Sequence, residues 1–103
     1  MGMLDNLKAL LASGQDNALL RFTLGNALLN QGDVQGAVEH LRQAITLDPG
    51  YSAAWKLYGK ALQAAHDRDG AIQAYEAGIV TAERNGDIQA AKEMKVFLGR
   101  LQK

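Results

Sequence analysis

Histidine and carboxylate side chains, the usual acids, bases and metal ligands of proteins, form no catalytic pattern in this sequence. His40 and His66 stand far apart, and Glu39 adjoins His40. Successive residues of a helix point about 100° apart, so Glu39 and His40 cannot act on one atom together. Neither histidine belongs to an HExxH motif or to another metal-ligand spacing. We therefore expect no metal site, with both histidines at the surface or at its boundary.

Nucleophiles and phosphate-binding loops are equally scarce. The sequence has no cysteine, which excludes disulfides, thiolate metal sites and cysteine nucleophiles. Ser13 and Ser52 lie beside expected helix ends, where a hydroxyl caps a helix or forms a turn. Gly32 and Gly36 lack the accompanying Lys and Ser or Thr of a P-loop. The sequence thus predicts a protein that is not an enzyme and holds no cofactor.

Composition narrows both the fold and the partners. Hydrophobic residues make up 48% of the chain and are mostly Ala and Leu, with a single proline, which favours an all-α fold. The 11 Lys and Arg residues balance 11 Asp and Glu residues, which argues against binding to a nucleic-acid backbone. Lys92, Lys95 and Arg100 form a mildly basic C-terminal segment without an aromatic platform. We therefore expect no nucleic-acid partner.

The start of the chain carries no recognisable targeting signal. Residues 1–8 have neither a basic start nor an unbroken apolar run. No stretch of the sequence approaches the roughly 18 apolar residues that a membrane span requires. We expect a cytoplasmic protein that does not interact with membranes.

Turn-forming residues divide the chain into six short segments. We expect Gly or Asn to end one helix in the left-handed conformation and Asp to cap the next, except where Pro49 ends a helix. Within the segments, apolar residues recur every three or four positions, which is typical of amphipathic helices. The turns are Ser13-Gly14-Gln15-Asp16, Asn30-Gln31-Gly32-Asp33, Asp48-Pro49-Gly50, His66-Asp67-Arg68-Asp69-Gly70 and Asn85-Gly86-Asp87.

The central segments repeat with a period of about 34 residues. Small residues recur at this period, and they let neighbouring helices approach closely, so the repeat indicates helix pairs that pack on one another. The matching positions are Gly25 with Gly59, Ala27 with Ala61, Leu28 with Leu62, Asp33 with Asp67, Gly36 with Gly70, Ala37 with Ala71 and Ile45 with Ile79.

These residues resemble the tetratricopeptide repeat family, whose units are helix pairs of about 34 residues. Arg21 replaces the signature Trp in the first unit, and the second unit, with Trp55, carries the fuller match. The resemblance implies a right-handed stack of antiparallel helix pairs. The first unit matches through Leu24-Gly25, Leu28, Gly36-Ala37, Leu41, Ala44 and Asp48-Pro49, and the second through Trp55, Tyr58-Gly59, Leu62, Gly70-Ala71, Tyr75 and Gly78.

We predict a single domain over residues 1–103 with about six helices. About three units are needed for a stable stack, so two repeats require flanking helices as covers. The start of the last helix, Gly86-Asp87-Ile88, echoes Gly32-Asp33-Val34, which leaves open whether it is a first or a second helix of a further unit. The predicted parts are an N-terminal helix at 3–13, a first repeat at 18–51, a second repeat at 52–85 and a C-terminal capping helix at 87–102.

The resemblance also implies a binding surface, because in this family the first helix of each unit lines a concave groove that holds a peptide. Lys56 and Lys60 lie one helical turn apart, so their charges repel unless an anion offsets them. We therefore predict a protein or peptide partner with acidic and apolar side chains. In the plain alternative, Phe22 packs on the N-terminal helix and both lysines are solvated. The predicted groove residues are Phe22, Asn26, Leu29 and Asn30 in the first repeat and Lys56, Lys60 and Gln63 in the second.

Two functions compete at this point. The leading one is a non-enzymatic protein–protein interaction module, a small adaptor or a chaperone-like binder of one peptide segment. The alternative is a self-associating assembly subunit that joins copies through the open ends of the stack. In either case we expect a monomer or a weak homodimer. The apolar residues expected at the two ends are Leu4, Leu7 and Leu11 on one side and Ile88, Phe97 and Leu101 on the other.

Overall fold

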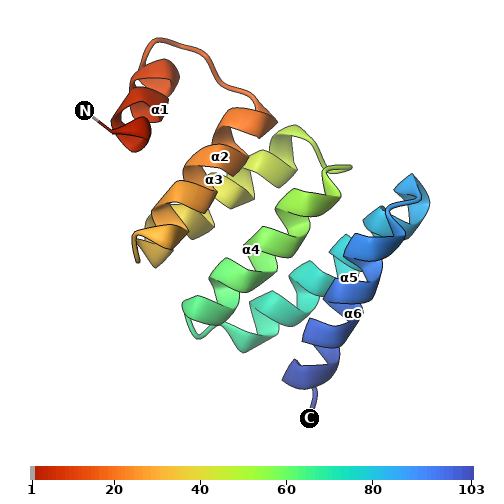
Figure 1. Cartoon of the computed structure of the whole chain (residues 1–103). Coiled ribbons are helices and arrows are strands. Elements are labelled where there is room, and N and C mark those ends of the chain that lie inside the picture. Colours follow the sequence, from red (N-terminus) through yellow and green to blue (C-terminus); the bar gives the residue numbers. More distant parts are fainter. Residues whose placement is uncertain (1) are drawn as a thin grey trace.

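The computed structural model describes residues 2–103, and this part of the chain forms six helices and no strand (Figure 1). Helices α2 and α3 form one antiparallel pair, α4 and α5 form a second, and α4 packs on α3 so that the pairs stack. This confirms the predicted all-α stack of helix pairs. The helices are α1 (Met3–Ala12), α2 (Ala18–Asn30), α3 (Val34–Leu47), α4 (Ser52–Ala64), α5 (Arg68–Asn85) and α6 (Ile88–Leu101).

Aspartates cap three of the helices, as the sequence predicts. Each carboxylate accepts a hydrogen bond from the backbone N–H three residues later, which satisfies a free donor of the first turn. Helix α2 departs from the expectation, because Asn17 accepts from the N–H of Leu20 while Asp16 pairs with Arg21. The capping pairs are Asp33 with Gly36, Asp67 with Gly70 and Asp87 with Ala90.

Left-handed residues shape the turns after α1, α2, α4 and α5. Three of them are glycines, Gly14, Gly32 and Gly86, with φ values of 94°, 85° and 77°. At the turn between α4 and α5, the left-handed residue is His66, with φ of 61°. A side chain is unfavourable in this conformation, and glycine avoids that cost. The second helix pair therefore contains a local strain that the first pair lacks.

The hydrophobic core lies between two rows of helices, with α2, α4 and α6 in one row and α3 and α5 in the other (Figure 1). Gly25 and Gly59 sit where the partners of each pair touch. A Cβ atom at Gly25 would overlap the side chain of Leu41, and one at Gly59 would overlap the ring of Tyr75. Glycine at these positions is what lets Leu41 and Tyr75 be fully buried.

The two ends of the stack are covered unequally. Helix α6 buries Ala90, Ala91 and Met94, packs along α5 and also contacts α4. It lies in the row of α2 and α4 (Figure 1), so it takes the place of a first helix although its capping sequence echoes second helices. Helix α1 packs on α2, and none of its residues is buried. The core is therefore closed at the C-terminal end and thinly covered at the N-terminal end.

Two hydrogen bonds join the segment around the start of α4 to the segment between the end of α5 and the start of α6. The Ser52 hydroxyl donates to the carboxylate of Asp87 at 2.9 Å, and the Asn85 amide donates to the carbonyl oxygen of Gly50 at 2.7 Å. The prediction of a capping or turn role for the Ser52 hydroxyl is therefore wrong. Its oxygen is directed across the stack, where Asp87 is close enough to accept the bond.

Candidate interaction surface

The first row of helices presents a continuous face, which we call the α2–α4–α6 face (Figure 1). On α2, Leu19, Thr23, Asn26 and Asn30 follow one another at spacings of three or four and therefore share one side of the helix. Asn26 and Asn30 are exposed, and Leu19 has 64% of its surface accessible. The α2 part of the face is thus an open strip of amide and apolar side chains.

Hollows lie at both ends of this strip, between α1 and α2. One has a volume of about 220 Å³ and is lined by Leu7, Leu10, Leu19 and Thr23 among others. The other has a volume of about 520 Å³ and reaches Asn30. Because α1 buries none of its residues, these hollows remain open beside the strip.

Phe22 and Leu29 are partly withdrawn from the strip. The ring of Phe22 packs on the ring of Tyr51, with centroids 5.1 Å apart. Both Phe22 and Leu29 are half-buried against the core. The Phe22 ring therefore packs against Tyr51, the residue that precedes α4.

The two lysines of α4 face partners supplied by α6. The Nζ atom of Lys56 lies 2.9 Å from Oε1 of Glu93, and Nζ of Lys60 lies 5.2 Å from the ring centroid of Phe97. A cation over an aromatic ring is attracted by its negative face. The negative charge that offsets the two neighbouring lysines is thus supplied by Glu93 of the same chain. Sequence reasoning missed Glu93, although Glu93 and Phe97 have the same one-turn spacing as the two lysines.

Gln63 is held by the core. Its Oε1 atom accepts a hydrogen bond from the hydroxyl of Tyr75. Burial raises the pKa of Tyr75 to about 12, so this hydroxyl keeps its proton and donates it. The Tyr75 ring also packs on Phe97, with centroids 5.6 Å apart. Of the predicted groove residues on α4, Lys60 is therefore the one most accessible to a ligand.

A separate polar cluster forms around Arg21, the residue that replaces the signature Trp. Its guanidinium donates to both carboxylate oxygens of Asp16, at 2.8 and 3.0 Å, and lies 3.1 Å from Nδ1 of His40. Burial, and then the charge of Arg21, lower the pKa of His40, so Nδ1 accepts from Arg21. The cluster joins the connection before α2 to α3. Within residues 2–103, no group of His, Asp or Glu side chains is arranged to hold a metal ion.

Comparison with known proteins agrees with this geometry. A sequence profile of the tetratricopeptide repeat matches residues 28–94. TPR repeat-containing protein PA0015 of Pseudomonas aeruginosa is 56% identical over 99 residues, which cover 96% of this chain and 94% of that protein. The chain therefore belongs to the tetratricopeptide repeat family, whose members are generally protein–protein interaction modules.

Solved structures share the same helix arrangement. The solution structure of protein BPP2914 from Bordetella parapertussis is 48% identical, with a TM-score of 0.85 over 99% of this chain and 89% of that one. A crystal structure of MamA protein is 27% identical, with a TM-score of 0.75 over 95% of this chain but 56% of that one. Over the residues that the structure describes, no helix is long and apolar enough to cross a membrane.

Proposed function

We propose that this protein is a small cytoplasmic adaptor, without enzymatic activity, that holds one peptide segment of a partner protein on its α2–α4–α6 face. The observation that carries the proposal is the open strip on α2, where Leu19 is 64% accessible and Asn26 and Asn30 are exposed beside hollows. Membership of a family of interaction modules supports it.

The strip suggests the chemistry of the ligand. An Asn amide both donates and accepts hydrogen bonds, so Asn26 and Asn30 suit the backbone of an extended peptide. The hollow beside Leu19 suits an apolar side chain of that peptide. An exposed cation–π contact contributes about 0.5–1 kcal/mol, so Lys60 can leave Phe97 for a ligand carboxylate. The ligand is thus a peptide with apolar and acidic side chains, with its acidic side chains nearest Lys60.

The binding test uses the protein as bait in an extract of its native host. Asn26→Asp/Asn30→Asp keeps the size of both side chains but removes donors and adds charge that repels an acidic ligand. We expect this variant to lose the partner, while Gln35→Glu, an exposed amide on α3, retains it. Peptides of the captured partner are then titrated by calorimetry, with Lys56→Glu/Lys60→Glu as a second variant. Equal binding by wild type and both double variants would refute the proposal.

The competing assembly function has less support. Three of the apolar residues that it needs, Leu4, Phe97 and Leu101, pack against the core and are only partly available. Under the adaptor proposal we expect a monomeric mass in light scattering over a concentration series. A stable dimer that dissociates when Ile88 is replaced by Lys would favour assembly instead.

A further inference from the structure

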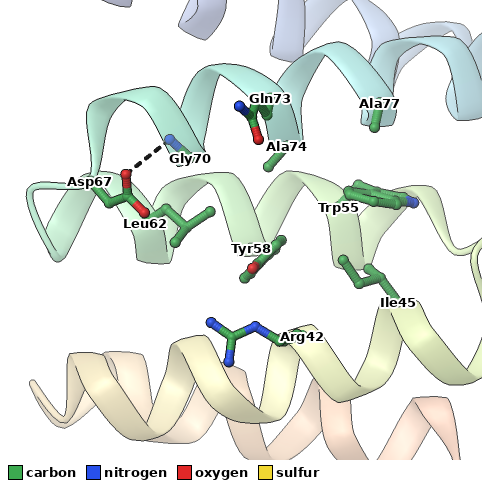
Figure 2. A pocket seen from close by; sticks show the side chains of 10 residues that line it. All are labelled: Arg42, Ile45, Trp55, Tyr58, Leu62, Asp67, Gly70, Gln73, Ala74 and Ala77. Atoms are coloured by element: carbon green, nitrogen blue, oxygen red, sulfur yellow. Dashed lines mark hydrogen bonds between the residues drawn. The ribbon is translucent and has the colours of Figure 1, made fainter.

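A second groove lies on the opposite side of the molecule from the α2–α4–α6 face. It runs between α3 and α5, with α4 as its floor, and has a volume of about 470 Å³ (Figure 2). We call it the α3–α5 groove. None of the residues predicted for the concave groove lines it. It is therefore a separate surface, to which the proposed function assigns no role.

The floor of the α3–α5 groove is aromatic. Trp55 and Tyr58 are half-buried, and their ring centroids are 6.4 Å apart. The indole N–H of Trp55 donates to the carbonyl oxygen of Pro49 at 2.8 Å, so this donor is already satisfied. What the floor offers to a ligand is therefore ring surface, which suits apolar and aromatic side chains.

Apart from Gln73, small residues form the wall that α5 contributes. Gly70, Ala74 and Ala77 line it at spacings of four and three, so they share one side of α5 (Figure 2). Gly70 must be small because a Cβ atom there would overlap the carboxylate of Asp67. Ala77, however, stands opposite Ile45, and a larger side chain at Ala77 would fill the space between the two helices. The small residue at this position keeps the groove open.

One cation stands at the middle of the groove. The Arg42 guanidinium extends from α3 toward the Tyr58 hydroxyl (Figure 2). Its ion pair with Glu39 is exposed, with 51% and 55% of the two side chains accessible, and such pairs contribute little. The Asp67 carboxylate at the end of the groove is bound by the N–H of Gly70 at 2.9 Å. A ligand in the groove therefore meets a positive charge that is free to exchange Glu39 for another carboxylate.

The groove has the features of a ligand site, namely apolar walls, a few converging polar groups and a volume within the range of about 300–1,000 Å³. We propose that it binds a segment of a second partner protein in which a carboxylate is flanked by an aromatic or branched apolar side chain. The carboxylate pairs with Arg42, and the apolar side chain packs between Ile45 and Ala77 on the aromatic floor. With the α2–α4–α6 face, this makes the protein a connector of two partners.

The chain itself reports on occupation of this groove, because Trp55 is its single tryptophan. A displayed library of random peptides is selected on the whole protein and then depleted on Ala77→Phe, in which the groove is filled. We expect the remaining peptides to carry an acidic residue beside an aromatic or branched one. They should change Trp55 emission saturably, and replacing their Glu by Gln should weaken binding about tenfold or more.

Variants of the protein complete the test. Arg42→Gln should bind the selected peptides more weakly by the same factor of about tenfold or more. Arg100→Gln, which changes an exposed arginine on α6, should bind them as the wild type does. Asn26→Asp/Asn30→Asp should also bind normally, which separates this groove from the proposed function. Circular dichroism checks that each variant is folded. Failure to select such peptides, or equal affinity for wild type and Arg42→Gln, overturns the proposal.

Discussion

The N-terminal half of the chain, α1 to α3, and the C-terminal half, α4 to α6, share one plan but differ in how they are closed. The C-terminal pair buries Tyr75 under α6, which adds the buried Met94. The N-terminal pair buries the smaller Leu41 and is flanked by α1, which buries nothing. The stability of a stacked repeat protein is roughly a sum over units and their neighbours. The comparison therefore indicates that the C-terminal end of the stack is closed more completely than the N-terminal end.

The same difference separates the roles of the two halves at the surface. In the C-terminal half, the lysines of α4 are engaged by α6, and Gln63 is held by Tyr75. In the N-terminal half, Asn26 and Asn30 stay exposed. On the α2–α4–α6 face, the polar groups of α4 are thus bound within the chain, while the amides of α2 are exposed. The unequal closure thus leaves the exposed amide strip of the α2–α4–α6 face on its N-terminal side.

The largest expected effect comes from removing the end helices. Deleting residues 87–103 uncovers the fully buried Tyr75 and removes Met94, whose truncation to Ala alone is expected to cost about 2–5 kcal/mol. Deleting residues 1–15 removes a helix with no buried residue and should cost less. Urea unfolding followed by circular dichroism measures both losses. An unchanged urea midpoint after the C-terminal deletion would contradict the comparison.

A smaller effect should follow from adding one methyl group at the helix contacts. Gly59→Ala presses on the rigid Tyr75 ring, and such overpacking costs about 1–3 kcal/mol. Gly25→Ala presses on Leu41, which can change rotamer, and Ala favours a helix by about 1 kcal/mol over Gly. We expect Gly59→Ala to be the more destabilising change in chemical denaturation. The reverse order would mean that the N-terminal pair is the more tightly packed.

Relief of the backbone strain at His66, in the turn of the second pair, should increase stability. His66→Gly removes a side chain from a left-handed residue and should stabilise the protein by about 0.5–1 kcal/mol. Gly32→Ala places a side chain at the equivalent turn of the first pair and should destabilise it by about 1 kcal/mol. Thermal melts of both variants test this. A loss of stability in His66→Gly would show that the imidazole itself stabilises the turn.

The smallest expected effect is on the pH dependence of stability, and it arises in the N-terminal half. Because the pKa of His40 is lowered on folding, the unfolded chain takes up a proton more readily than the folded one. Stability is therefore retained above the ordinary pKa of about 6.5 and declines as the pH falls below it. His40→Asn should flatten this decline between pH 7 and pH 5.5. Identical pH profiles for wild type and His40→Asn would exclude the assigned role of His40.

Local features of this protein are predictable from its sequence, and those that depend on the third dimension are not. The caps Asp33, Asp67 and Asp87 and the contact glycines Gly25 and Gly59 follow from turn chemistry and from the repeat. The sequence does not predict in which row of helices α6 lies, because first and second helices can begin with the same capping residue. Whether the predicted groove residues bind a peptide stays a prediction.

The contacts that redefine the candidate site join distant parts of the chain. Lys56 meets Glu93 only after α6 has folded back along α4, so no spacing within one helix indicates that pair. The α3–α5 groove likewise combines Arg42, Tyr58 and Ala77 from three helices. None of these residues stands out as a binding residue within its own helix. Only the packing of the helices brings them together.

The hydrogen bonds from Ser52 to Asp87 and from Asn85 to Gly50 have a mechanical consequence. They tie the segment from Gly50 to Ser52 to the segment from Asn85 to Asp87, so these two segments separate only if both bonds break. The two turns are therefore held together by bonds within the chain itself. Any ligand on the α2–α4–α6 face would therefore meet a braced edge at this end, while at the other end α1 covers α2 without a buried residue of its own.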